Sequence, residues 1–173
     1  DTQNALAQYQ DARNQGLNTA LVSAQKALIN AQQNYQDAAG NYNTAKADYD
    51  SGKNTSVVSA KQQLASQQAS YNSASKQHDD GMMSDEAFAS SQVALANAQE
   101  NLRLAKEQAE KQIDDYYDAF TQAEQALANA ERDYEASLLN AGQTVENYEN
   151  NVEKAQALSS TETTEIELEH LNE

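Results

Sequence analysis

The chain contains no cysteine, no proline and no tryptophan, and only five of its 173 residues are glycine. Without cysteine it can form neither a disulfide framework nor a Cys-ligated zinc site. The aromatic residues are nine tyrosines and two phenylalanines, and much of the 39% apolar fraction is alanine. Because large apolar side chains are few, the sequence cannot fill a thick globular core. It can fill narrow helix–helix seams, which need two apolar positions in seven.

Basic residues are also scarce, since 11 lysines and arginines stand against 27 aspartates and glutamates, for a net charge of −16. We therefore expect no nucleic acid and no anionic membrane surface as a direct partner. No segment approaches 18 consecutive apolar residues, so no direct membrane insertion is expected. The sequence shows no signal peptide and no initiator methionine, and it opens in helical sequence. We expect it to be a fragment of a larger protein.

What the chain does contain is a long heptad pattern. In its first part, apolar residues alternate in steps of four and three, which is typical of a left-handed coiled coil. These seam residues are Leu17, Leu21, Ala24, Leu28, Ala31, Tyr35, Ala38, Tyr42, Ala45 and Tyr49. The pattern breaks at 51–56, where Gly52 suits a helix C-terminus and Asn54, Thr55 or Ser56 could cap a new helix.

The heptad pattern then resumes with phase slips of one residue. It runs through Val57, Ala60, Leu64, Gln67, Tyr71, Ala74 and His78. Beyond residue 84 it runs through Phe88, Ser91, Leu95, Ala98, Leu102, Ala105 and Ala109. After one slip it continues through Ile113, Tyr116, Phe120, Ala123, Leu127, Ala130 and Tyr134, and after another through Val145, Tyr148, Val152 and Ala155. A shorter pattern of Leu6, Tyr9 and Arg13 precedes it, and Ile166, Leu168 and Leu171 follow it.

The positions of the slips predict the fold. If the chain folds back at residue 81 or 82, the slip at 49–57 lies opposite the slip at 109–113, and Gly142 lies near Leu21. Paired seams must change phase together to stay interlocked. We therefore predict an all-α fold, a long antiparallel two-stranded coiled-coil helical hairpin with a local break near 51–56. Residues 1–173 would form a single domain, with arm one at 1–78, the tip at 79–84 and arm two at 85–173.

A compact four-helix bundle, with turns at 51–56, 79–84 and 140–143, is the competing architecture. Its helices would have roughly 49, 23, 56 and 29 residues, whereas up-and-down bundles require matched lengths. The hairpin is therefore favoured over the bundle.

Residues that support chemistry are sparse. The two histidines, His78 and His170, lie at opposite ends of the predicted hairpin, and phosphate-binding, zinc-protease, nucleophile-elbow and EF-hand patterns are absent. His78 beside Asp79 and Asp80 is a weak metal pattern, and a solvated turn explains it more simply. We predict no catalytic residue, no cofactor, no metal site and no enzymatic activity.

The turn at 79–86 is the most distinctive segment. Gly81 is suited to the turn, and Ser84 is placed to cap the second helix with two acidic residues near its positive end. The two methionines between them are flexible and apolar, so they either form a contact point or pack back onto Phe88.

At these residues the sequence resembles the membrane fusion proteins, the HlyD-like periplasmic adaptors of bacterial export systems. Hairpins of that family turn through a glycine, two largely apolar residues and a serine, and the return helix starts with acidic and then aromatic or aliphatic residues. The corresponding residues here are Gly81, Met82, Met83, Ser84, Asp85, Glu86, Ala87 and Phe88, followed by Leu95, Ala96, Ala98, Leu102 and Ala105. The flanking arms agree with the family only in heptad character.

The resemblance implies a non-catalytic hairpin that bridges or docks a membrane transporter of ABC type to outer components. The docking tip would be Gly81, Met82, Met83 and Ser84. It further implies an extracytoplasmic location in the cell envelope, a parent protein anchored to the cytoplasmic membrane, and homo-oligomeric rings assembled with the transporter.

One departure from the family pattern narrows this expectation. Adaptors that dock onto an outer-membrane channel carry an arginine and a leucine 11 and seven residues before the tip serine. This chain has Ser73 and Gln77 there, and only Ser84 matches. We therefore expect a system without that channel, such as a Gram-positive ABC exporter adaptor. The alternative is a surface-anchored helical rod or adhesin-like spacer, in which residues 79–84 are only a turn.

Overall fold

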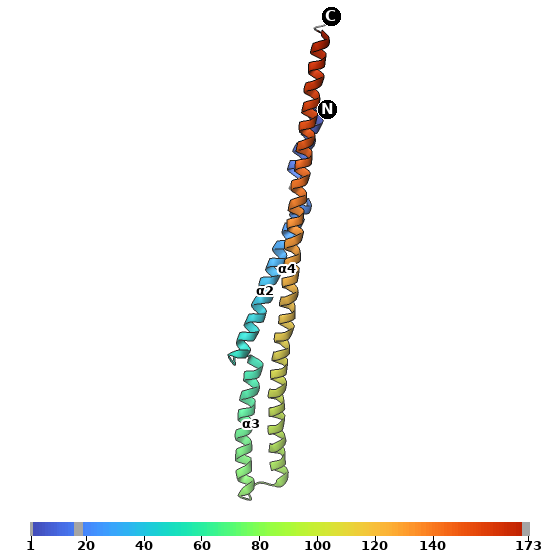
Figure 1. The fold of residues 1–173 in the computed structure, drawn as a ribbon. Coiled ribbons are helices and arrows are strands. Elements are labelled where there is room, and N and C mark those ends of the chain that lie inside the picture. Colours follow the sequence, from blue (N-terminus) through green and yellow to red (C-terminus); the bar gives the residue numbers. More distant parts are fainter. Residues whose placement is uncertain (1, 16–18, 171–173) are drawn as a thin grey trace. The chain divides into compact units, whose positions relative to one another are not determined.

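The computed structural model describes residues 2–15 and 19–170, with side chains at 4, 6–11, 19–158 and 160. The helices are α1 (Thr2–Gln15), α2 (Thr19–Asp50), α3 (Thr55–Asp79) and α4 (Asp85–His170) (Figure 1). No strand occurs in these ranges, so the all-α prediction is confirmed. The predicted seam residues that lie outside the described residues or side chains are Arg13, Leu17, Ile166, Leu168 and Leu171, and the side chain of His170 also lies outside them.

Packing contacts divide the chain into two units, and each is described by itself. One comprises residues 1–34 and 124–173, and the other comprises residues 35–123. The single hairpin over 1–173 stays a prediction. The competing bundle is wrong in one respect, because α4 passes through residues 140–143 as continuous helix.

The unit at 35–123 is an antiparallel helical hairpin whose arms lie side by side (Figure 1). Ring contacts join the arms at two levels: the centroids of Tyr42 and Tyr117 are 5.4 Å apart, and those of Tyr71 and Phe88 are 5.6 Å apart. From Tyr42 to Tyr71 is 29 residues, and from Phe88 to Tyr117 is also 29 residues. The arms therefore advance equally between these contacts and keep one register.

Between those two levels, arm one breaks where the sequence predicts it. α2 ends at Asp50, and Gly52 adopts a φ of 71°, a left-handed conformation that favours glycine. The backbone N–H of Gly52 donates to the Tyr49 carbonyl and that of Lys53 to the Asp48 carbonyl, which is the Schellman motif of a helix end. The Asn54 side-chain oxygen then accepts from the Val57 N–H at 3.2 Å and caps α3.

The break faces the predicted slip in the other arm. The Tyr49 hydroxyl donates a hydrogen bond to the Glu110 carboxylate. A shallow polar groove of about 430 Å³ places Asn54 and Thr55 beside Gln112. The two phase slips therefore lie opposite each other in this unit, as predicted. The predicted proximity of Gly142 and Leu21 stays a prediction.

The seam between the helices is built from small residues. The buried side chains among those described are Ala31, Val57, Ala60, Ala74, Ala98, Ala109 and Val152. All seven belong to the predicted heptad pattern, and every predicted seam residue from Leu21 to Ala155 is buried or half-buried. Alanine lets two helix backbones approach closely, while half-buried tyrosine and leucine side chains cover the gaps between these contacts.

The seam near the chain start is only partly as predicted. In the unit formed by 1–34 and 124–173, Leu6 and Tyr9 of α1 line a groove with Val152 of α4, which is buried. Tyr9 is half-buried, but Leu6 is 42% exposed. Leu6 therefore lies at the edge of this contact rather than inside it.

Replacing Gly52 with alanine should destabilise the hairpin by about 1–2 kcal/mol, because an L-residue resists the left-handed conformation. An added Cβ would meet nothing within 4 Å at Gly52, so the cost comes from the backbone alone. Gly40 is the matched control, since it is equally open but helical. Gly40→Ala should stabilise by roughly 0.5–1 kcal/mol. Urea unfolding followed by circular dichroism tests this, and equal shifts for both variants would contradict it.

The pKa of the Tyr49 hydroxyl should lie above the ordinary value for tyrosine. The hydrogen bond to Glu110, followed by desolvation, raises the pKa of the Tyr49 hydroxyl above its ordinary value. A raised pKa in the folded state gives stabilisation that is complete below about pH 10 and is lost as the pH rises through the folded pKa. Alkaline absorbance titration should show that Tyr49→Phe removes a component that titrates above the ordinary pKa of tyrosine. Glu110→Gln should move that component to lower pH, whereas Asp114→Asn should leave it in place.

Candidate docking tip

The turn at 79–84 begins with the same kind of helix end as the break. α3 ends at Asp79, and Gly81 adopts a φ of 72°. The Gly81 N–H donates to the His78 carbonyl at 2.9 Å, and the Met82 N–H donates to the Gln77 carbonyl at 2.8 Å. These bonds form a second Schellman motif, so the predicted role of Gly81 in the turn is confirmed.

The return helix starts with a side-chain cap. The Ala87 N–H donates to the Ser84 hydroxyl oxygen at 3.3 Å, and the Phe88 N–H donates to the Ser84 carbonyl at 3.0 Å. Asp85 and Glu86 occupy the first turn of α4, where negative charge favours the positive end of the helix dipole. The predicted capping role of Ser84 is therefore confirmed.

His78 closes the base of the turn, a role that the sequence did not predict. Its Nε2 lies 2.7 Å from Oδ1 of Asp85, and its Nδ1 lies 4.0 Å from Oδ1 of Asp79. Since an ionised carboxylate only accepts, Nε2–H donates to Asp85 across the turn. The His78 ring also stacks on Phe88, with centroids 4.6 Å apart and planes at 18°. His78, Asp85 and Phe88 thus join the end of α3 to the start of α4.

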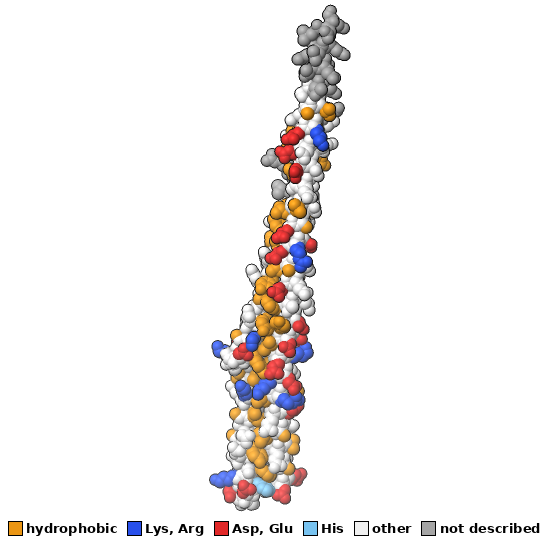
Figure 2. Space-filling view, in the orientation of Figure 1, with side chains coloured by type: hydrophobic (Ala, Val, Ile, Leu, Met, Phe, Trp, Pro, Cys, Tyr) orange, Lys and Arg blue, Asp and Glu red, His pale blue; other side chains and the backbone are white. Residues whose placement is uncertain are grey.

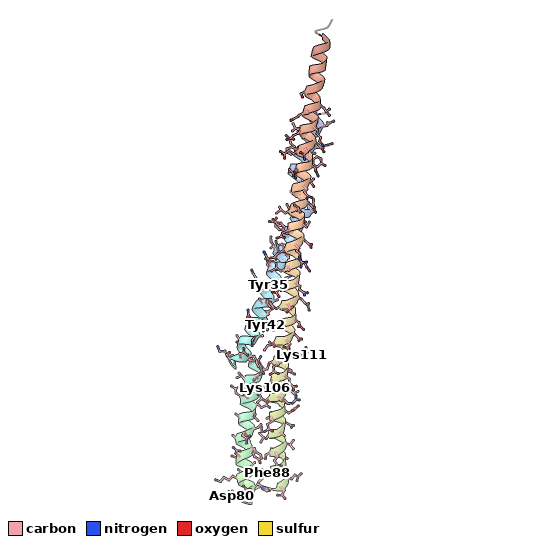
Figure 3. The ribbon with its side chains drawn as sticks, viewed as in Figure 1. Tyr35, Tyr42, Asp80, Phe88, Lys106 and Lys111 are labelled. Carbon is pink, nitrogen blue, oxygen red and sulfur yellow. The ribbon has the colours of Figure 1, made fainter. Side chains whose placement is uncertain are left out.

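This contact could have been partly anticipated. His78 and Phe88 both occupy seam positions, and Figure 3 shows Phe88 between the two helices, next to the turn that carries Asp80. Phe88 further contacts Tyr71, and such an aromatic pair contributes roughly 0.5–1.5 kcal/mol beyond its buried area. The seam pattern does not predict the hydrogen bond from the His78 imidazole to Asp85, because Asp85 lies outside the seam.

The two methionines have different surroundings. Met82 is 71% exposed and projects from the turn. Met83 is half-buried and lies against α3, where it lines an open groove of about 440 Å³. Met82 is therefore accessible, and its role as a contact point stays a prediction, whereas Met83 packs partly against α3.

The groove beside Met83 also contains the two positions at which the sequence departs from the channel-docking adaptors. It is lined by Ala69, Ser70, Ser73, Ala74, Gln77 and Met83. Ser73 and Gln77 thus share one surface with the tip. Their small or neutral side chains give this surface no positive charge.

Among the described side chains, no group of three or more histidine, cysteine, aspartate or glutamate residues is placed to hold a metal ion. Within the described ranges, no helix is long and apolar enough to cross a membrane. Comparisons of the chain with models of protein families, with curated proteins and with solved structures gave no match.

Replacing Ser84 with alanine should weaken the start of α4 by about 1 kcal/mol, because the cap on the Ala87 amide is lost. Hydrogen exchange at the bonded amides of Ala87 and Phe88 should accelerate about fivefold, which is that free energy expressed as a rate ratio. Ser90→Ala is the control, since the Ser90 hydroxyl only donates back to the Glu86 carbonyl within the helix. Unchanged exchange in Ser84→Ala would contradict the capping role.

Proposed function

We propose that this chain is the non-catalytic α-hairpin of an export-system adaptor and that its tip docks onto a partner protein. The observation that carries the proposal is the 71% exposure of Met82 on a turn whose two helix ends are both capped. Removing an exposed methionine side chain from water lowers the free energy, which favours its burial by a partner. Nothing in the hairpin covers it more than partly.

The turn is built to hold this side chain in place. The Schellman motif at Gly81 and the cap at Ser84 fix the backbone on both sides of Met82. The hydrogen bond from His78 to Asp85 joins the end of α3 to the start of α4. A surface that is already fixed loses little conformational entropy on binding, so less of the binding free energy is lost in ordering the tip.

The wider role follows from the resemblance of residues 81–105 to membrane fusion proteins. On that basis the full-length protein is anchored to the cytoplasmic membrane, the hairpin lies in the extracytoplasmic cell envelope, and rings of the protein work with a transporter of ABC type. Ser73 and Gln77 in place of arginine and leucine favour a system without an outer-membrane channel, as in a Gram-positive bacterium.

A surface rod or adhesin-like spacer is the alternative, and it makes the opposite prediction about the tip. In a spacer the turn only reverses the chain, so the identity of residue 82 has no consequence provided that Gly81 and Ser84 are kept. Substitution of Met82 therefore distinguishes the two functions.

Met82→Ser should abolish export, because it removes the apolar contact and leaves the caps intact. Its helicity and urea midpoint should stay at the wild-type values, since an exposed residue contributes little to folding. The measurement is complementation of a strain deleted for the gene that encodes this chain. Val93→Ser is the matched control, because Val93 is 59% exposed on α4 but lies outside the turn. It should export normally.

Two results would sink the docking role while leaving the hairpin intact. One is wild-type export by Met82→Ser. The other is an equal loss in Met82→Ser and Val93→Ser, because the tip would then have no special importance.

A further inference from the structure

Negative charge is concentrated at the tip. Between Asp50 and Glu100, every acidic residue of the chain lies within residues 79–86. No lysine or arginine occurs between Lys76 and Arg103. The acidic residues of the turn, which we call the acidic collar, are Asp79, Asp80, Asp85 and Glu86.

The acidic collar flanks the turn that carries the exposed methionine, and it faces water. The side chain of Asp79 is 76% exposed and that of Asp85 is fully exposed, and Asp80 and Glu86 are exposed as well. Figure 2 shows aspartate and glutamate side chains on both sides of the end of the hairpin that carries the turn. Asp79 and Asp80 lie at the end of α3 and Asp85 and Glu86 at the start of α4, so the exposed Met82 stands on a turn with like charge at both of its ends.

This charge pattern restricts what can cover Met82. A second tip of the same chain would bring two collars together and be repelled, as would a nucleic acid or an anionic lipid surface. A purely apolar cavity would have to strip water from carboxylates without giving them a partner, which is costly. A surface that offers cations around an apolar centre suits both Met82 and the collar.

We propose that the tip docks by inserting Met82 into an apolar socket of a partner protein whose rim carries arginine or lysine side chains that pair with the acidic collar. This inference rests on the proposed docking function and adds the chemistry of the partner. Arginine suits the rim best, because its guanidinium can bind a carboxylate through two parallel hydrogen bonds.

The proposed contact is weak for one tip. Covering one methionine side chain strengthens binding by roughly 10- to 100-fold. Rim ion pairs mainly accelerate association, and salt screens them over about 10 Å at 0.1 M. Stable docking therefore needs the full-length protein held near its partner, so that several tips or a second contact act together. The test must use that protein in place and trap the contact covalently.

The experiment places a genetically encoded photo-crosslinking amino acid at position 82 of the complete gene product, in cells of the source organism. The same amino acid at position 93 is the control. Cross-linked peptides are sequenced by mass spectrometry. Crosslinking in isolated membranes is then repeated at low and high salt, and in the charge-neutralising variant Asp80→Asn/Glu86→Gln. This variant keeps the His78–Asp85 hydrogen bond, and Asp114→Asn/Asp118→Asn removes the same number of charges from α4 away from the turn.

The expected result is a protein crosslink at position 82 that exceeds the one at position 93 and maps to a peptide containing arginine or lysine. Its yield should fall at least about threefold in Asp80→Asn/Glu86→Gln and at high salt, and stay unchanged in Asp114→Asn/Asp118→Asn. The salt series on the unmodified tip gives the same answer even if the variant folds poorly.

The failures are distinguishable. A position-82 crosslink no stronger than that at position 93 overturns the docking function and this inference together. A strong position-82 crosslink to a protein overturns only the cationic rim if its yield changes with neither the salt concentration nor the collar charges. Crosslinks to lipid or to another copy of the chain show a different occupant and overturn the inference.

Discussion

The close approach of two helix backbones at alanine is the contact on which the rest of the structure depends. Ala98 and Ala109 are among the most buried of the described residues, at 2% and 4% exposure. No described large side chain is fully buried, so each turn of the seam removes only a small apolar area from water. Stability therefore accumulates along many turns. It depends on the register that places each alanine in the space between side chains of the facing helix. Ion pairs such as Lys111–Asp115 lie within one helix and support that helix rather than the pairing.

Much of this could be predicted, because heptad spacing translates directly into burial. The predicted seam from Leu21 to Ala155 agrees with the observed burial at each position, and Gly52, Gly81, Asn54 and Ser84 end or begin helices as their conformational preferences suggest. In these cases a residue's own backbone, or a partner one turn away, decides the structure. Longer-range features were missed. The bond from His78 to Asp85 depends on how α3 meets α4, and the exposure of Leu6 depends on how α1 meets α4.

The two glycine helix ends show why local sequence was insufficient. Gly52 and Gly81 make the same pair of backbone hydrogen bonds, yet the chain continues along the hairpin after the first and reverses after the second. Asn54 restarts a helix two residues after Gly52, whereas Ser84 does so three residues after Gly81. The chain direction after each glycine depends on the helix against which the new helix packs its apolar side chains. α3 continues on the seam of α4, while the start of α4 returns along α3 through Phe88, Tyr71 and His78.

The equal count of 29 residues on both arms across the break has a mechanical consequence. Arm one changes phase at the loop 51–54, whereas arm two passes the facing slip at 109–113 as continuous helix. A force along the hairpin therefore acts on one continuous arm and one interrupted arm. The hydrogen-bond ladder of α4 is continuous and stiff, whereas the loop beside it can yield without separating the seams on either side. The continuous α4 therefore resists a change in the length of this hairpin, while arm one can bend at the loop 51–54.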